Sequence, residues 1–202
     1  MDALIPAAGR GTRLGKRTET RPKGLVKIAG QPLLAHVFET AVEAGAKELV
    51  VVIGYEGAQI VDHFGDAFAG VPITYVHQRE RLGLGHAVRQ AEPHIDGSFL
   101  LVNGDNVFAG SVAPAVAAAS EEDVDGALAV EEVSRAEAST TGVLEPDGDR
   151  VTGLVEKPDD PPSTLVTTGC FVLPADVFHA CALVQPSAEG EYQLSEAVGL
   201  LV

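Results

Sequence analysis

An uninterrupted apolar run in the first third of the chain most constrains its fold. After its first residue, the segment ELVVVI (residues 48–53) contains only aliphatic side chains, most of them β-branched. Such a run is typical of a strand buried on both faces, as in a parallel sheet covered by helices. Before it, apolar residues repeat at helical spacing over residues 33–42, with Pro32 at the expected helix start and Gly45 at its end. A short strand over Ala3–Pro6 precedes that helix.

The alternation of strands and helices continues along the chain. We expect helices over residues 56–64, from residue 85 to about residue 93, and over 112–122. We expect strands from residue 72, from residue 98 and over 125–133. This pattern predicts an α/β fold with a Rossmann-like, mostly parallel sheet, helices on both faces and right-handed crossovers.

The pattern changes from Gly142 onward. Two strands are expected around the turn at residues 146–149, followed by a strand within 165–174, a helix over 174–182 and a helix from about residue 191. No fixed-period repeat or low-complexity linker divides the chain, so we expect a single domain over residues 1–202.

Charge limits the partners of the protein. With 29 acidic residues and 14 Lys and Arg, the net charge is −15, which disfavours binding to nucleic acid or anionic membrane. The sequence has neither an apolar stretch long enough to span a membrane nor a signal-peptide pattern. We therefore expect a cytoplasmic protein and, because halophiles use such charge, a halophilic source. Cys170 and Cys181 read as ordinary thiols.

A glycine-rich, basic segment directly follows the first strand. In AAGRGTRL (residues 7–14), Gly9 and Gly11 allow close approach of the backbone to a ligand, and exposed N–H groups can form an anion-binding nest. Arg13 and Lys23 add positive charge at the same end of the sheet. The segment matches neither the P-loop nor the dinucleotide fingerprint. A phosphate site and a solvated surface turn therefore both stay open.

Two further segments carry charged residues at the ends of expected strands. Asp105 in LVNGDN lies where parallel sheets bind ligands and could hold Mg²⁺, although a simple turn explains it equally well. Glu156 and Lys157 could bind a polyol and its phosphate, although the pair alone is more typical of a solvated edge. The histidines show no metal-ligand spacing, and no Ser–His–acid order is present.

Taken in order, these segments resemble the sugar-phosphate nucleotidyltransferase family, the nucleoside-diphosphate-sugar pyrophosphorylases. The resemblance covers essentially the whole chain, and the motifs GLGHAV and GEYQLSEA are most similar to those of glucose-1-phosphate uridylyl- and thymidylyltransferases. The motifs that carry it are AAGRGTRL, RPKGLVKIAGQPLLAHV, GLGHAV, NGDNVF, GVLEPDG with VTGLVEKP, TTGCFVLPADVF and GEYQLSEAV.

The resemblance implies that an NTP (UTP or dTTP favoured) and a sugar 1-phosphate (glucose 1-phosphate favoured) give an NDP-sugar and pyrophosphate, with Mg²⁺ as cofactor. Arg13 and Lys23 would be catalytic, Arg13 on the β- and γ-phosphates and Lys23 at the α-phosphate. Asp105 would coordinate the magnesium. Gly142 and Glu156 would face the sugar, and Lys157 its phosphate. The nucleotide-binding residues would be Ala7, Ala8, Gly9, Gly11, Thr12, Gln78 and Gly83.

This reaction needs no activated side-chain nucleophile, because the sugar phosphate is already anionic at neutral pH. Catalysis then reduces to positioning two anions and stabilising their charge, which suits a basic pocket without a catalytic triad.

The chain also departs from the family pattern. Lys16 and Arg17 stand where a proline is usual, Thr141 where an aromatic residue is frequent, and Asn103 where a leucine is frequent. Family members usually continue beyond the position of Val202 and carry a second metal-binding Asp. We therefore expect a domain that lacks the usual C-terminal end of the family.

Two alternatives remain open at this point. One is a non-catalytic module that binds nucleotide or sugar phosphate, which the short C-terminus favours and the retained cationic residues do not. The other is a related transferase that acts on another phosphate, such as phosphocholine. Family members are often oligomeric, which leaves a homo-oligomer open.

Overall fold

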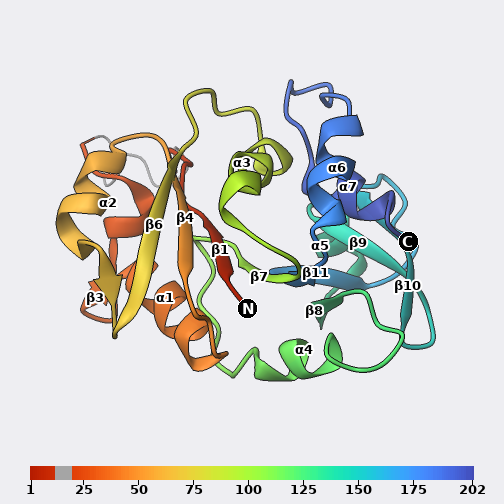
Figure 1. Cartoon of the computed structure of the whole chain (residues 1–202). Coiled ribbons are helices and arrows are strands. Elements are labelled where there is room, and N and C mark those ends of the chain that lie inside the picture. The colour runs from red at the N-terminus through yellow and green to blue at the C-terminus, as the bar shows by residue number, and fades with distance from the viewer. Residues whose placement is uncertain (12–19) are drawn as a thin grey trace.

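The central strands of the molecule run parallel, as their apolar runs predict. The computed structural model describes residues 1–11 and 20–202, so Thr12 and Arg13 lie outside the described residues. Within the described part of the chain, nine strands form one sheet, with β7, β1, β4 and β6 side by side at its centre (Figure 1). Each neighbouring pair among these four is parallel. They span Phe99–Val102 (β7), Ala3–Pro6 (β1), Leu49–Ile53 (β4) and Val71–His77 (β6).

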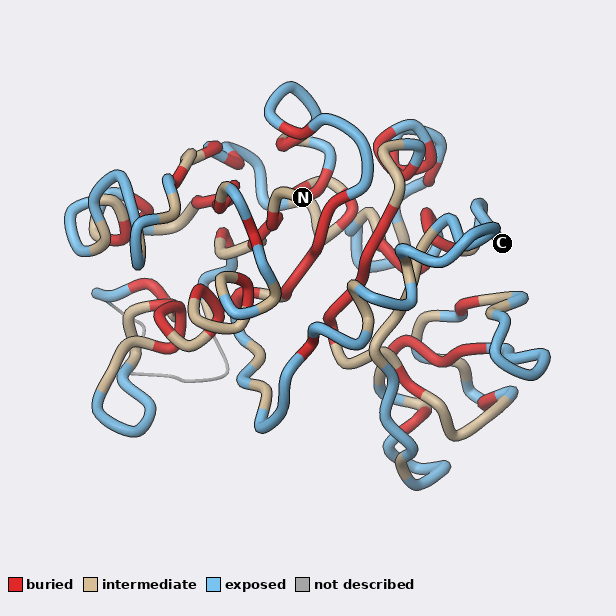
Figure 2. Tube along the Cα trace, turned by 60° about the horizontal axis from the view of Figure 1, so that its bottom comes forward, coloured by how far each residue is buried: buried red, intermediate tan, exposed pale blue. Residues whose placement is uncertain are grey.

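Alternate residues of these strands are buried on opposite faces of the sheet. In β1, Leu4 belongs to one apolar cluster, whereas Ala3 and Ile5 belong to another. β4 divides in the same way, and all of its residues are buried. Figure 2 shows the buried segments running through the middle of the molecule. This two-sided burial explains why residues 48–53 are uniformly apolar and do not alternate with polar residues.

Helices cover both faces of the sheet, which confirms the expected layers. On the face of Ile5 lie α1 (Leu33–Glu43), α2 (Gly57–Phe64) and α4 (Ala113–Ala118). On the face of Leu4 lie α3 (Leu84–Gln90), α6 (Asp176–Leu183) and α7 (Leu194–Gly199). None of the helices in the described ranges is long and apolar enough to cross a membrane.

The C-terminal half extends the sheet with antiparallel strands. β11 (Leu165–Leu173) pairs antiparallel with β7, with β8 (Ala127–Glu132) and with β9 (Gly142–Asp147). β10 (Arg150–Glu156) forms the expected hairpin with β9. The α/β class is confirmed, with a parallel centre and an antiparallel flank. β8 departs from the parallel alternation because half of its residues are exposed, whereas parallel strands are normally buried on both faces.

The remaining elements are short. β2 (Lys27–Ile28) and β3 (Gln31–Pro32) form a small hairpin before α1, and β5 (Ala67–Phe68) pairs with β6. Within residues 1–11 and 20–202, the 3₁₀ turns are η2 (Lys23–Leu25) and η3 (Glu92–His94). η3 follows α3 and contains Pro93, near which the helix was expected to end. The sequence reading missed α5 (Arg135–Ala138), although a capping box between Ser134 and Glu137 marks its start.

Candidate active site

A cavity of about 410 Å³ opens at the carboxyl ends of the parallel strands. The end of β1 and the residues after it reach the cavity through Pro6 to Gly9, the segment after β6 through Gln78, and the loop after β7 through Asn103 to Asp105. Parallel strands end at the same edge of a sheet, so residues far apart in the sequence meet there. Among the residues expected to bind substrates, those that line the cavity are Ala7, Ala8, Gly9, Lys23, Gln78, Gly83 and Asp105.

The end of β1 and the loop after β7 are in direct contact at the wall of the cavity. The Gly104 N–H donates to the Pro6 carbonyl at 3.1 Å. A Cβ atom added at Gly104 would lie only 2.5 Å from that carbonyl oxygen, so a larger residue would push the two loops apart. Gly104 therefore sets the spacing between the glycine-rich segment and the loop that carries Asp105.

Lys23 and Asp105 form an ion pair at the wall of the cavity. The Lys23 Nζ lies 2.5 Å from the Asp105 Oδ2, and the two side chains are 30% and 46% exposed. Gly11 packs against Lys23 and has a left-handed backbone conformation with φ +65°. A Cβ atom added at Gly11 would lie only 2.9 Å from the Cβ of Lys23. An exposed pair of this kind contributes about 0–1 kcal/mol, so a phosphate or a metal ion can replace either partner at little cost.

Gln78 is a buried polar residue that joins β6 to the start of α3. Its side chain is 3% exposed, and Nε2 donates to the Gly83 carbonyl at 3.2 Å. The same nitrogen lies 2.9 Å from His86 Nδ1, which makes that ring nitrogen the acceptor. The structure thus brings the two expected base contacts, Gln78 and Gly83, together. His86, which lies beside them, was not predicted from the sequence as a site residue.

The loop that contains Gly83 packs against a segment near the C-terminus. The Tyr192 N–H donates to the Leu82 carbonyl at 2.8 Å, and the Gly85 N–H donates to the Tyr192 carbonyl at 2.9 Å. An added Cβ at Gly83, which has φ +96°, would lie 2.7 Å from that tyrosine carbonyl. Gly83 therefore permits both the backbone conformation and the close contact.

Two charged residues that line the cavity were not foreseen as site residues. Arg81 lies in the loop between Gln78 and Gly83, and Glu191 lies in the segment that packs against this loop. Arg81 lies two positions before the GLGHAV segment and Glu191 lies within the GEYQLSEAV segment, so their place in the sequence was the available signal.

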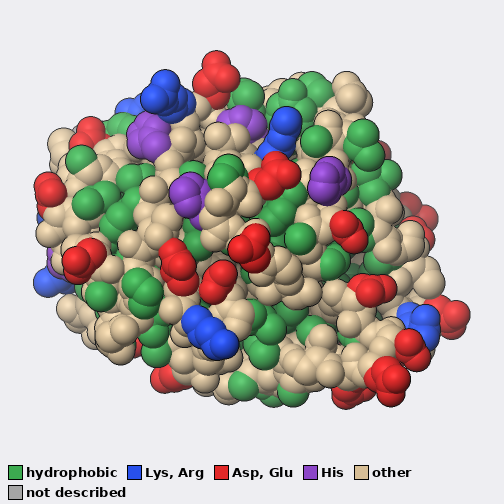
Figure 3. Space-filling model, in the orientation of Figure 1, with side chains coloured by type: hydrophobic (Ala, Val, Ile, Leu, Met, Phe, Trp, Pro, Cys, Tyr) green, Lys and Arg blue, Asp and Glu red, His purple; other side chains and the backbone are tan. Residues whose placement is uncertain are grey.

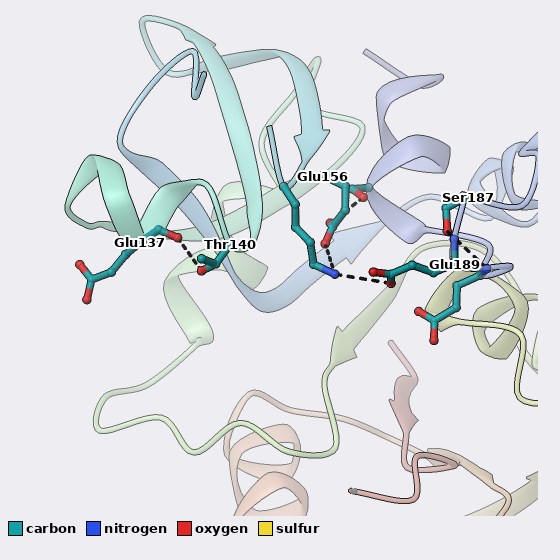
Figure 4. A network of polar contacts seen from close by, with 8 residues as sticks. Glu137, Thr140, Glu156, Ser187 and Glu189 are labelled. Carbon is teal, nitrogen blue, oxygen red and sulfur yellow. Dashed lines mark hydrogen bonds and ion pairs between the residues drawn. The ribbon is translucent and has the colours of Figure 1, made fainter. Parts of the chain in front are cut away.

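The residues expected to bind the sugar phosphate form a second cluster on the β9–β10 hairpin. Gly142 and Glu156 are direct partners across this antiparallel pair, and Lys157 follows in a left-handed conformation with φ +44°. The Lys157 Nζ lies 3.9 Å from Glu156 Oε1 and 4.0 Å from Glu189 Oε2, so the two carboxylates converge on it (Figure 4). These three expected residues do not line the cavity described above.

Ser195 on α7 completes the second cluster. Its hydroxyl donates to Glu156 Oε2 at 2.9 Å, and the serine is buried. The sequence reading missed Ser195 and Glu189. Ser195 lies within the GEYQLSEAV motif, but nothing in the local pattern connects it with a residue 39 positions earlier.

Oxygen atoms are the available metal donors at this edge. The described residues contain no group of three or more His, Cys, Asp or Glu that could hold a metal ion. Asp105 offers an exposed carboxylate to the cavity, and the neighbouring Asn103 has a buried Oδ1 without a hydrogen-bond partner among the described residues. A single carboxylate together with phosphate oxygens is a donor set that Mg²⁺ accepts.

Comparison with known proteins matches this architecture. The family model described as nucleotidyl transferase matches residues 2–202. The chain is 48% identical to the UTP–glucose-1-phosphate uridylyltransferase AglF of Haloferax volcanii, over all of this chain and 84% of that protein. It is 35% identical to the bifunctional protein GlmU of Methanococcus maripaludis over all of this chain, which spans 47% of that protein.

Comparison of the fold with solved structures gives related enzymes. A solved UDP-glucose pyrophosphorylase in complex with UDP-glucose superposes with a TM-score of 0.89 and 27% identity, over 99% of this chain and 86% of that one. Sequence motifs, cavity position and both comparisons agree, and the chain belongs to the nucleotidyl transferase family.

Proposed function

We propose that the protein transfers a nucleotidyl group from UTP or dTTP to glucose 1-phosphate, giving an NDP-glucose and pyrophosphate. The observation that carries the proposal is the Lys23–Asp105 pair at 2.5 Å on the wall of a cavity at the carboxyl ends of the parallel strands. A cation and a potential metal ligand side by side suit a reaction between two phosphates. The uridylyltransferase relative and the UDP-glucose-bound structure favour this pair of substrates.

The reaction joins two anions. An oxygen of the sugar 1-phosphate attacks the α-phosphorus of the NTP and forms a new P–O bond. The bond from this phosphorus to the oxygen that bridges to the β-phosphorus breaks, and pyrophosphate leaves with the electron pair. Lys23 would stabilise the charge that develops on the α-phosphoryl oxygens. Arg13, which lies outside the described residues, would neutralise the leaving pyrophosphate.

The nucleotide would occupy the cavity. The open surface at Gly9, beside which an added Cβ would meet no atom within 4 Å, would leave room for the phosphates near the backbone of Ala7 and Ala8. Gln78 and Gly83, joined by a hydrogen bond at 3.2 Å, would face the base. Gly11 and Thr12 would complete the glycine-rich segment.

The sugar phosphate would bind at the second cluster. The Glu156 carboxylate can accept hydrogen bonds from sugar hydroxyls, and Gly142 leaves space beside it. The Lys157 ammonium is 47% exposed and can meet the phosphate. In this assignment the phosphate would replace Glu189 as the partner of Lys157.

Mg²⁺ fits the oxygen donors at the cavity wall. Asp105 would hold it, and Asn103 Oδ1, which has no hydrogen-bond partner among the described residues, would be a further oxygen donor. When bound, the ion would supply positive charge that offsets the repulsion between the two phosphates. Lys23 would then be free to contact the nucleotide.

We also propose that the protein works in a salty cytoplasm. Its net charge of −15 and the relative from Haloferax volcanii support this setting. Acidic side chains are spread over the face seen in Figure 3, and basic ones are few there.

Pyrophosphate release tests the proposed function. UTP, dTTP, CTP, ATP and GTP would each be paired with glucose 1-phosphate, galactose 1-phosphate and phosphocholine in multi-molar KCl with Mg²⁺. We expect the fastest release with UTP or dTTP and glucose 1-phosphate. Release with phosphocholine alone would indicate the related transferase. Calorimetric binding without release for any pair would indicate a non-catalytic module.

A further inference from the structure

The two oxygens of the Glu156 carboxylate have different surroundings. Oε2 accepts the hydrogen bond from Ser195 at 2.9 Å, whereas Oε1 faces the Lys157 ammonium at 3.9 Å. The side chain of Glu156 is 26% exposed, so the carboxylate is partly accessible to a ligand. One oxygen is therefore held by the protein, and the other lies on the side where a cation and a ligand can reach it.

Ser195 is held firmly by its surroundings. It is 8% exposed, and its neighbours Leu194, Ala197 and Val198 on α7 belong to the same buried cluster as Leu154 of β10. The hydroxyl therefore projects from a packed helix to a strand that shares its core. A hydrogen bond from a donor fixed in this way favours one rotamer of the glutamate.

Gly142 lies beside the Glu156 carboxylate in that rotamer. It is the direct partner of Glu156 across the hairpin, and an added Cβ would lie 3.4 Å from Glu156 Oε2. That separation is an ordinary van der Waals contact. Gly142 therefore lies directly beside the oxygen that Ser195 holds.

We propose that Ser195 is a positioning residue for sugar recognition: it fixes Glu156 Oε2 so that Oε1 is presented to a sugar hydroxyl. This inference rests on the proposed function. It adds that sugar affinity depends on a buried hydroxyl that does not itself touch the substrate. A carboxylate accepts hydrogen bonds, so its partner on the substrate is a hydroxyl donor.

The test compares Ser195→Ala, Ser195→Thr and a matched control, Ser163→Ala. Ser163 lies just before β11 and is half-buried, and its hydroxyl donates to the Leu144 carbonyl at 2.6 Å and not to a carboxylate. The measurements are kcat and KM for glucose 1-phosphate and for UTP, with the melting temperature of each variant. We expect Ser195→Ala to raise KM for glucose 1-phosphate about tenfold, which is about 1.4 kcal/mol, and KM for UTP less than twofold.

Two further comparisons separate positioning from simple packing. Ser195→Thr keeps the hydroxyl and should restore most of the affinity for glucose 1-phosphate. In a Glu156→Ala background, Ser195→Ala should have no further effect on KM for glucose 1-phosphate, because it acts only through the carboxylate. Equal losses for both substrates, or full additivity of the two substitutions, would overturn the proposal.

Failure of the proposed function is distinguishable from failure of this inference. If the wild type makes no NDP-sugar from any substrate pair, the proposed function fails. Calorimetry with glucose 1-phosphate then decides on Ser195. A Kd about tenfold weaker in Ser195→Ala than in the wild type and in Ser163→Ala would support the positioning role, and equal Kd values would refute it.

Discussion

Lys23 Nζ lies 2.5 Å from Asp105 Oδ2, although 82 positions separate the two residues. The pair forms because the segment after β1 and the loop after β7 end at the same edge of the parallel sheet. In the proposed reaction the two residues have different partners, with Lys23 on phosphate oxygens and Asp105 on a cation. Their pairing means that each balances the charge of the other until substrates arrive.

Lys23→Met should abolish most of the transferase activity while leaving the fold intact. The ammonium is 30% exposed and its ion pair contributes little to stability, so the loss should appear in catalysis. Removal of one such charge-stabilising group typically lowers kcat about 100- to 1000-fold. The control is Lys27→Met, an exposed lysine on β2, which should change kcat less than about twofold. Similar kcat values for the two variants would contradict the assignment of Lys23.

Asp105→Asn should weaken the binding of Mg²⁺, so that more Mg²⁺ is needed for activity. The amide keeps the shape of the side chain but removes the negative charge that would attract the ion. We expect the Mg²⁺ concentration for half-maximal pyrophosphate release to rise roughly tenfold or more, as for the loss of an important group at a metal site. The measurement is initial rate against Mg²⁺ concentration at saturating UTP and glucose 1-phosphate. A titration curve identical to that of the wild type would remove Asp105 from the metal site.

The parallel half of the fold could be predicted because strands that are buried on both faces have uninterrupted apolar sequences. All residues of β4 are buried, and the run Leu49–Ile53 is correspondingly apolar. β8 has no such apolar run along its whole length, since its second half is exposed. β8 pairs antiparallel with β11 because of how distant segments of the chain pack, and the sequence of neither strand indicates this pairing.

The candidate site could also be predicted only in part. Asp105 and the glycine-rich segment were predicted as candidates because strand ends in α/β sheets gather ligand-binding residues. Ser195 was missed because its bond to Glu156 spans 39 positions and depends on where α7 docks. Gln78 was identified by resemblance, but its burial beside His86 follows from the packing of α3 against the sheet.

Salt should stabilise the protein if its acidic surface is an adaptation. The net charge of −15 causes self-repulsion in the folded state, and salt screens that repulsion within a Debye length of about 10 Å at 0.1 M. We expect the melting temperature to rise steadily from 0.1 M to about 3 M KCl. Calorimetric scans at fixed pH would measure it. A melting temperature that stays constant or falls over this range would exclude the proposed salt adaptation.

The buried thiols should make stability fall at alkaline pH. Burial raises the pKa of Cys181 from 9.0 to about 12, despite the nearby Arg89, and burial raises that of Cys170 to about 11. Above pH 9 the unfolded thiol loses its proton while the folded one keeps it. The free energy of unfolding therefore falls by up to about 1.4 kcal/mol per pH unit per thiol up to the folded pKa.

Urea unfolding of the wild type and of Cys181→Ala between pH 8 and 10.5 would measure this slope. Tyr75, whose pKa is raised to about 12 by burial and by Asp66, contributes equally to both proteins. The variant should therefore lose less stability than the wild type across the same interval, whatever its stability at pH 8. Parallel curves for the two proteins would show that Cys181 is accessible to solvent.

Gly104→Ala should destabilise the protein because the loops after β1 and β7 leave no space for a methyl group. The added Cβ would lie 2.5 Å from the Pro6 carbonyl oxygen, so the backbone must shift. We expect a loss of about 1–3 kcal/mol in the free energy of unfolding, measured in urea. The matched control is Gly110→Ala, where an added Cβ meets no atom within 4 Å. If both variants unfold at the same urea concentration, the contact between Gly104 and Pro6 does not constrain the site.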